Sequence, residues 1–137
     1  MSPPNSPVSR AESVRQRTLT VLASVLEKGK SGGLPEPPTA IFAGSDQQAF
    51  GVYEAARQHG LRIPEDLSVV GFDELPVARW ASPPLTTVRQ PLAEMGSAAA
   101  QMLGELIDGA PLRSNRVELS TELIVRESTA PPREREK

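Results

Sequence analysis

The stretch LSVVGFDELP, residues 67–76, decides how the rest of the chain is interpreted. Its first six residues are mostly apolar and partly β-branched, which predicts a buried β-strand over 67–72. Two carboxylates, Asp73 and Glu74, follow at once, and a proline closes the stretch. A carboxylate at the end of a buried strand can be a metal ligand, half of a catalytic pair, an acceptor for a bound ligand or a turn residue. The surrounding sequence bears on this choice.

A strand and a helix precede this stretch. TAIFAG (39–44) predicts a short buried strand, and the pattern after it predicts a helix over 46–59. Ser45 or Asp46 can serve as the N-cap, and Gly60 falls where a left-handed residue ends a helix. Strand, helix and strand in this order form a βαβ unit, which predicts a parallel sheet with a right-handed crossover.

The sequence downstream continues the α/β pattern. LTTVRQ (85–90) predicts a third strand, and Pro91 suits the first turn of an amphipathic helix over 92–108. VELS (117–120) and ELIVRES (122–128) predict two further short strands. The fold class is therefore α/β with a parallel sheet.

Breaker-rich and charged stretches divide the 137 residues into four parts. Residues 1–9 are rich in Pro and Ser and are expected to be disordered, as is the charged tail 130–137. Residues 10–37 hold a predicted helix and a loop rich in Gly and Pro, and residues 38–129 form the folded lobe.

Composition excludes several classes of function. A net charge of −2 and a pI of about 5.5 argue against nucleic-acid contact by this segment, which would need a basic surface. The chain has no cysteine, so disulfides and thiolate metal sites are excluded. The N-terminus is no secretory signal, and no apolar run reaches the roughly 20 residues of a membrane helix. We expect a cytoplasmic protein without membrane contact.

Three features that suggest chemistry each have a plainer interpretation. EKGKSGG (27–33) resembles a phosphate-binding loop, but Ser24 stands where that motif needs its first glycine. The single histidine, His59, lies at a predicted helix end and lacks partners for catalysis or zinc binding. Trp80 can be a core or interface anchor, or an apolar wall against a ligand ring. We therefore expect no enzyme, no catalytic residue, no metal and no cofactor.

Acidic side chains follow the carboxyl ends of two strands that the βαβ unit makes neighbours. Ligands bind outside this edge in open parallel sheets. A helix cap is enough to explain Asp46 beside Ser45. Asp73 precedes no predicted helix, so its spacing leaves two roles open, an acceptor for a bound ligand or an Asx-turn.

Most of the folded lobe resembles the effector-binding region of bacterial LacI/GalR-family transcriptional regulators. The similar blocks are PTAIFAGSDQQAFGVYEAARQHGLRIPEDLSVVGFDELP (38–76), PPLTTVRQPLAEMGSAAAQMLGELIDG (83–109) and TELIVRES (121–128). The resemblance implies a periplasmic-binding-protein-like fold of type I, with two lobes around a small-molecule cleft. The chain corresponds to the C-terminal lobe, which is incomplete without its partner lobe. It lacks a helix-turn-helix pattern and most of an N-terminal lobe, so we expect a fragment of a longer regulator.

The resemblance also implies residue roles. Asp73 matches an aspartate that contacts the effector, which is often a sugar or a nucleobase-like molecule. Ser45 matches a cleft position where Asn is frequent, and Asp46 is the usual aspartate beside it. Leu92 matches a position that carries an aromatic ring in some members. The four implied ligand-binding residues are thus Asp73, Ser45, Asp46 and Leu92.

Phe50 and Tyr53 match a helix of the family's homodimer interface, although packing within one subunit is the alternative. Helix 92–108 would pack on the N-terminal lobe. The resemblance implies a non-enzymatic effector-sensing domain of a repressor-type, DNA-binding regulator that works as a homodimer. Two alternatives stay open: an interaction fragment that modulates an intact regulator, and a free-standing sugar-binding protein.

Overall fold

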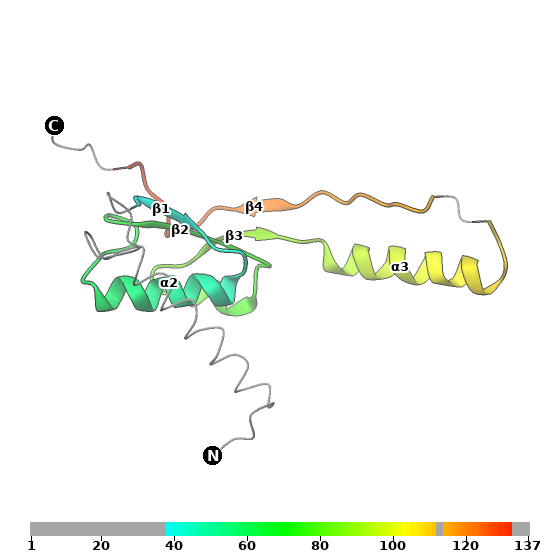
Figure 1. Ribbon diagram of the computed structural model, residues 1–137, viewed down its shortest axis with the longest axis horizontal. Helices are drawn as coiled ribbons and strands as arrows, with labels where there is room; N and C mark the ends of the chain where they lie inside the picture. Colours follow the sequence, from blue (N-terminus) through cyan, green and yellow to red (C-terminus); the bar gives the residue numbers. More distant parts are fainter. Residues whose placement is uncertain (1–37, 112–113, 133–137) are drawn as a thin grey trace, which may run out of the picture.

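A computed structural model describes residues 38–111 and 114–132 of the chain (Figure 1). The predictions of a disordered segment 1–9 and of a helix with a Gly/Pro loop over 10–37 lie outside the described residues, as does most of the predicted tail. Within the described part, strands and helices follow one another in the α/β order that the sequence predicts.

A sheet of four strands in the order β1-β2-β3-β4 organises the described residues. The strands span Ala40–Phe42 (β1), Ser68–Phe72 (β2), Thr86–Arg89 (β3) and Glu122–Ile124 (β4). The first three run parallel, and β4 pairs with β3 in the antiparallel sense. The predicted parallel βαβ unit is confirmed. Because the register pairs Phe42 with Val70 and Phe72 with Val88, the carboxyl ends of β1, β2 and β3 meet at one edge.

Helix α2, Asp46–Gln58, lies along one face of this sheet (Figure 1). Ser45 is its N-cap, because its Oγ accepts a hydrogen bond from the backbone N–H of Gln48. The helix ends as predicted: Gly60 has φ of 67°, and the N–H of Leu61 donates to the carbonyl of Ala56 at 2.9 Å.

The hydrophobic core lies between α2 and the sheet. Its buried members come from α2, from β2, from the residues next to β1 and β2, and from the segment before β3: Ala43, Ala49, Val52, Ala55, Ala56, Leu67, Val69, Ala78 and Leu85. Small alanines on α2 let the helix approach the sheet closely, while the larger aliphatic side chains come mainly from the sheet side.

The C-terminal segment differs from the prediction. VELS (117–120) forms no strand and is mostly exposed, so that prediction is wrong; none of the described strands pairs with it. The predicted strand 122–128 is shorter, because regular pairing stops at Ile124. Beyond it, Ser128 lies between two other strands: its carbonyl accepts from Val69 N–H, and its Oγ accepts from Thr86 N–H, each at 2.8 Å.

Ala130 extends the ordered contacts one residue past the predicted boundary of the lobe at 129. Its N–H donates to Ser68 Oγ at 3.0 Å, and its carbonyl accepts from the same hydroxyl at 3.1 Å. The end of the lobe is therefore tied to the start of β2.

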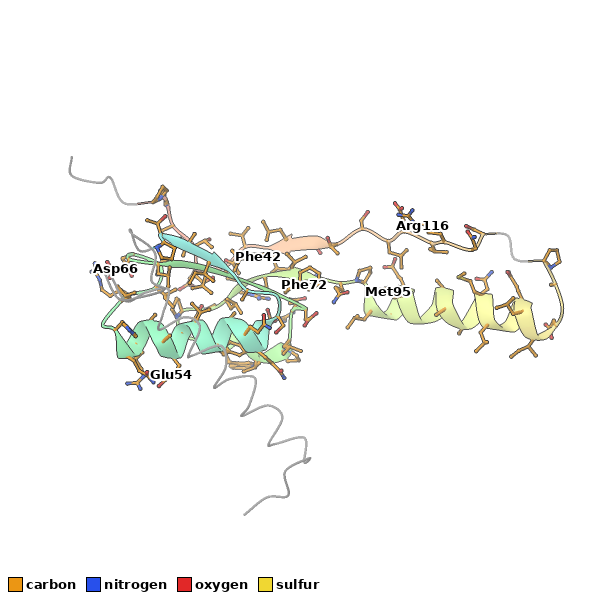
Figure 2. The ribbon with its side chains drawn as sticks, in the orientation of Figure 1. Phe42, Glu54, Asp66, Phe72, Met95 and Arg116 are labelled. Atoms are coloured by element: carbon orange, nitrogen blue, oxygen red, sulfur yellow. The ribbon has the colours of Figure 1, made fainter. Side chains whose placement is uncertain are left out.

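Helix α3, Leu92–Ile107, stands away from the sheet (Figure 1). None of its residues is buried, and Met95 lies on the projecting part of the chain (Figure 2). Its exposed apolar side chains include Leu92, Met95, Leu103, Leu106 and Ile107. No helix among the described residues is long and apolar enough to cross a membrane.

Candidate functional site

The carboxyl edge of the parallel strands gathers Ser45, Asp73 and Leu92, which the sequence analysis singled out, together with Gln90, which it did not. Ser45 follows β1, Asp73 follows β2, and Gln90 and Leu92 follow β3. Since the three strands are adjacent and parallel, these residues lie along one edge of the sheet. We call these four residues, together with the turn 73–75, the edge site.

Asp46 supports the edge site from beneath. Its side chain is completely buried at the first turn of α2. One oxygen, Oδ2, accepts the backbone N–H of Leu75 at 2.7 Å, and Oδ1 accepts the hydroxyl of Thr87 at 2.5 Å. A buried carboxylate is stable when its oxygens are hydrogen-bonded in this way and the positive end of a helix lies close. Asp46 therefore acts on the site through the turn that it holds.

Asp73 occupies an uncommon backbone conformation at the edge. Its φ is 107°, a value that residues with a Cβ rarely adopt, and its N–H donates to the carbonyl of Val88 at 2.9 Å. Its Oδ1 accepts a hydrogen bond from Gln90 Nε2 at 2.7 Å. Among the residues that the structure describes, nothing binds the second oxygen, Oδ2. Asp73 thus presents a half-buried carboxylate with one oxygen available.

Ser45 and Leu92 lie on either side of Asp73 in the order of the strands, since they follow β1 and β3. The Ser45 oxygen caps α2 at 3.3 Å from Gln48 N, so its own proton is left for another acceptor. Leu92 is the first residue of α3 and is 61% exposed, which makes it an apolar surface two residues beyond Gln90.

Glu74 turns away from the edge into a cluster of arginines. Its Oε1 accepts from Arg126 at 2.7 Å, Arg89 at 3.1 Å and Arg79 at 3.3 Å, and its Oε2 accepts from Arg89 Nε. Arg89 also pairs with Glu122 on β4 at 2.9 Å. The hydrogen bonds from Arg89, helped by Arg126 and Arg79, lower the pKa of Glu74 from 4.5 to about 2 although partial burial opposes them.

No sequence pattern indicated this cluster of arginines. Its arginines come from the short 3₁₀ helix η1 (Pro76–Arg79), from β3 and from the segment after β4. No local spacing unites positions so far apart in the chain. Gln90, in contrast, follows a predicted strand end, so the rule that selected Asp73 would have selected it too.

A groove of about 880 Å³ runs along the outer side of α2, away from the edge site. Phe50 and Tyr53 line it, with ring centroids 6.3 Å apart in an edge-to-face arrangement. The Tyr53 hydroxyl donates to the carbonyl of Pro83 at 2.9 Å, and burial raises the pKa of Tyr53 to about 12. Glu54, on the same wall, points away from the sheet (Figure 2).

The single histidine and the single tryptophan take different positions. His59 is the C-cap of α2, with Nδ1 2.9 Å from the carbonyl oxygen of Ala55, as expected for a helix end. Trp80 directly follows η1 and is 83% exposed, so its interpretation as a core anchor is wrong. Its alternatives, an interface anchor or a ligand wall, stay open. Within the described residues, no three His, Cys, Asp or Glu side chains gather as a metal site requires.

The close approach of β2 to Asp46 gives a test of the support beneath the site. A Cβ on Gly71 would collide with Asp46 Oδ1 and press on Leu85. We expect Gly71→Ala to lower the free energy of unfolding by roughly 1–3 kcal/mol, measured by urea denaturation. Gly96→Ala is the matched control, since open space surrounds that position on α3; it should be neutral or stabilise by up to about 1 kcal/mol. Equal effects of both changes would contradict the packing described.

The pKa of Glu74 gives a second test. Because its pKa is lower in the folded protein than the usual 4.5, its ion pairs stabilise the fold above about pH 4.5, and this stabilisation disappears as the pH falls toward 2. Glu74→Gln should therefore be less stable than the wild type at pH 7, and the difference should shrink between pH 5 and pH 2. Urea denaturation at both ends of this range measures it. A difference that does not change with pH would show that the charge of Glu74 contributes nothing.

Comparison with known proteins shows which family this arrangement belongs to. The periplasmic binding protein-like domain matches residues 2–129. The repressor CytR of Escherichia coli is 43% identical over 96 residues, which cover 70% of this chain and 28% of CytR. The regulator MalR of Streptomyces coelicolor is 42% identical over 123 residues, covering 88% and 36% respectively. The chain thus spans about a third of the length of these relatives.

Solved structures of transcriptional regulators resemble this chain as well. A complex of the transcriptional regulator CelR with cellobiose is 42% identical with a TM-score of 0.63, covering 66% of this chain and 28% of that one. A LacI-family regulator from Enterococcus faecium with bound ribose is 30% identical with a TM-score of 0.68, and the match covers 87% of this chain and 41% of that one. A dimeric Lac repressor with an 11-residue C-terminal deletion is 31% identical with a TM-score of 0.70, and the match covers 90% of this chain and 41% of that one. The chain therefore belongs to the periplasmic binding protein-like domain family, in the form that LacI-type transcriptional regulators carry.

Proposed function

We propose that the edge site binds a small neutral effector, a sugar or a nucleobase-like molecule, and that the domain senses this effector for a transcriptional regulator without catalysing a reaction. The observation that carries the proposal is the pair of Asp73 and Gln90, an acceptor beside a donor at the strand ends. Sugar hydroxyls both donate and accept, so adjacent hydroxyls complement such a pair.

The comparisons support this choice of ligand. Two similar structures hold sugars, cellobiose in one and ribose in the other. The edge site has few features that would suit a strongly charged ligand, since the arginines nearby are engaged by Glu74. Leu92 supplies an apolar surface for the carbon face of a ring. Because Ser45 is short and Leu92 is not aromatic, the contacts that select one sugar lie elsewhere.

In a regulator of this type, effector binding acts by shifting a population between conformations. The effector must bind one conformation more tightly than the other, and a second lobe closing over the edge site would supply that difference. Relatives that regulate transcription support a place in the cytoplasm for this protein. One lobe alone buries only part of a ligand, so binding to this chain should be weak.

Titration of ¹⁵N-labelled chain with ribose, cellobiose and adenosine, followed by NMR, tests the proposal. We expect at least one of these ligands to shift the amide signals of residues 73–75 and 90–92, with a dissociation constant on the order of 1 mM. Asp73→Asn should weaken that binding about tenfold or more, because a charged acceptor is lost.

Asp66→Asn is the matched control, since Asp66 pairs with Arg62 far from the edge. It should leave the affinity unchanged. The proposal fails if none of the three ligands shifts these signals, or if binding survives Asp73→Asn.

We also propose that the chain self-associates through the groove of α2. The supporting observation is the aromatic wall of Phe50 and Tyr53, which stays partly exposed although the Tyr53 hydroxyl is anchored within the subunit. Aromatic side chains of this kind are enriched in protein interfaces. A similar structure is that of a dimeric Lac repressor.

Sedimentation velocity over a range of concentrations tests this association. We expect a monomer–dimer equilibrium for the wild type and a dissociation constant raised at least tenfold by Phe50→Ala, as an interface anchor predicts. Phe42→Ala is the control, since Phe42 is 65% exposed on β1 and does not line the groove. A wild type that stays monomeric, or an equal effect of both changes, would contradict the proposal.

A further inference from the structure

The turn after β2 holds two successive residues in a backbone conformation that favours glycine. Asp73 has φ of 107° and Glu74 has φ of 54°. Both carry a Cβ, so neither adopts such angles without compensating contacts. The turn must therefore be held by interactions of its own.

Backbone hydrogen bonds hold the two ends of the turn. Asp73 N–H donates to the carbonyl of Val88, and Leu75 N–H donates to buried Asp46. Glu74 lies between these points, and its backbone makes no hydrogen bond to another described residue. What fixes its position is its side chain, which is only 9% exposed.

The contacts of that side chain reach across the sheet. Arg89 on β3 binds both oxygens of Glu74, and Arg126 binds Oε1 at 2.7 Å from beyond β4. Arg126 is itself held, because its Nη1 donates to the carbonyl of Leu85 at 2.8 Å. A carboxylate bound by two guanidinium groups from different segments is confined in both position and orientation.

We propose that Glu74 is a positioning residue for the edge site: its ion pairs with Arg89 and Arg126 fix the turn so that the carboxylate of Asp73 meets Gln90 and a bound ligand. The inference rests on the proposed function of Asp73 as a ligand acceptor. Glu74 itself faces the arginines and touches no ligand.

The negative charge of Glu74 also helps to keep Asp73 in position. The cations around it are Arg79, Arg89 and Arg126, and Glu122 is the other anion that pairs within the cluster. Without the charge of Glu74, three cations would face one remaining anion, and Asp73 is the adjacent carboxylate in the chain. Glu74 therefore keeps the arginines occupied and leaves Asp73 to Gln90.

NMR of the full chain tests the inference without any ligand. In Glu74→Gln at pH 7 we expect the side-chain amide signals of Gln90 to move toward those of a free amide. Hydrogen exchange at the amides of Asp73 and Leu75 should become at least tenfold faster relative to the amides within α2. The matched control is Glu54→Gln, which removes an exposed ion pair with Arg57 on α2 and should change neither observable.

A merely structural role for Glu74 predicts faster exchange throughout the lobe by one common factor, and that result would overturn the inference. Unchanged Gln90 signals would overturn it as well. Arg79→Gln provides a milder change, since Arg79 is 65% exposed and makes the longest contact with Glu74. It should shift the Gln90 signals in the same direction by a smaller amount, and no shift would count against the role even if Glu74→Gln does not fold.

These outcomes are distinct from those of the ligand titration. If ribose, cellobiose and adenosine fail to bind while Glu74→Gln still releases Gln90, the proposed function fails and the positioning of Asp73 stands. If a sugar binds but Glu74→Gln leaves Gln90 in place, the positioning role fails alone.

Discussion

The buried carboxylate of Asp46 is the interaction on which the edge of the sheet depends. It joins the start of α2 to Leu75 in the turn after β2 and to Thr87 on β3. A solitary buried carboxylate would be costly, and this one is stable because each oxygen accepts a hydrogen bond and a helix N-terminus lies beside it. Gly71 makes room for it, since any larger residue would collide with Oδ1. One side chain therefore sets the relative positions of the start of α2, the turn after β2 and strand β3.

Asp46 and Glu74 hold the same turn by different means. Asp46 lies inside the core and uses neutral donors, so its bonds need only correct geometry. Glu74 lies nearer the surface and uses arginines, whose charge attracts it but is partly screened by water. The turn that both residues hold keeps Asp73 in place. One of its carboxylate oxygens accepts a hydrogen bond from Gln90, and the other is available. Such a preorganised acceptor binds a ligand without first having to be ordered.

The sequence was sufficient to predict most of the helices and strands, but it was not sufficient to predict the contacts between them. Strands β1, β2 and β3 and both long helices follow from apolar runs, periodicity and caps, all of which are local signals. VELS (117–120) has the composition of a strand yet remains unpaired, because pairing depends on a neighbour that the sequence alone does not reveal. Except for Arg79, the partners of Glu74 and Asp46 are separated from them by 15 to 52 residues, so only the fold brings them together.

Helix α3 begins within the edge site, because Leu92 belongs to both. It buries none of its residues, and an isolated helix of this length is only marginally stable in water. Its exposed apolar side chains are therefore suited to pack against another surface. Gln90, which holds Asp73, lies two residues before α3 begins. The ligand proposed at Asp73 and any partner that packs on α3 would act on the same short segment, so a preference of one for its geometry would change the affinity of the other.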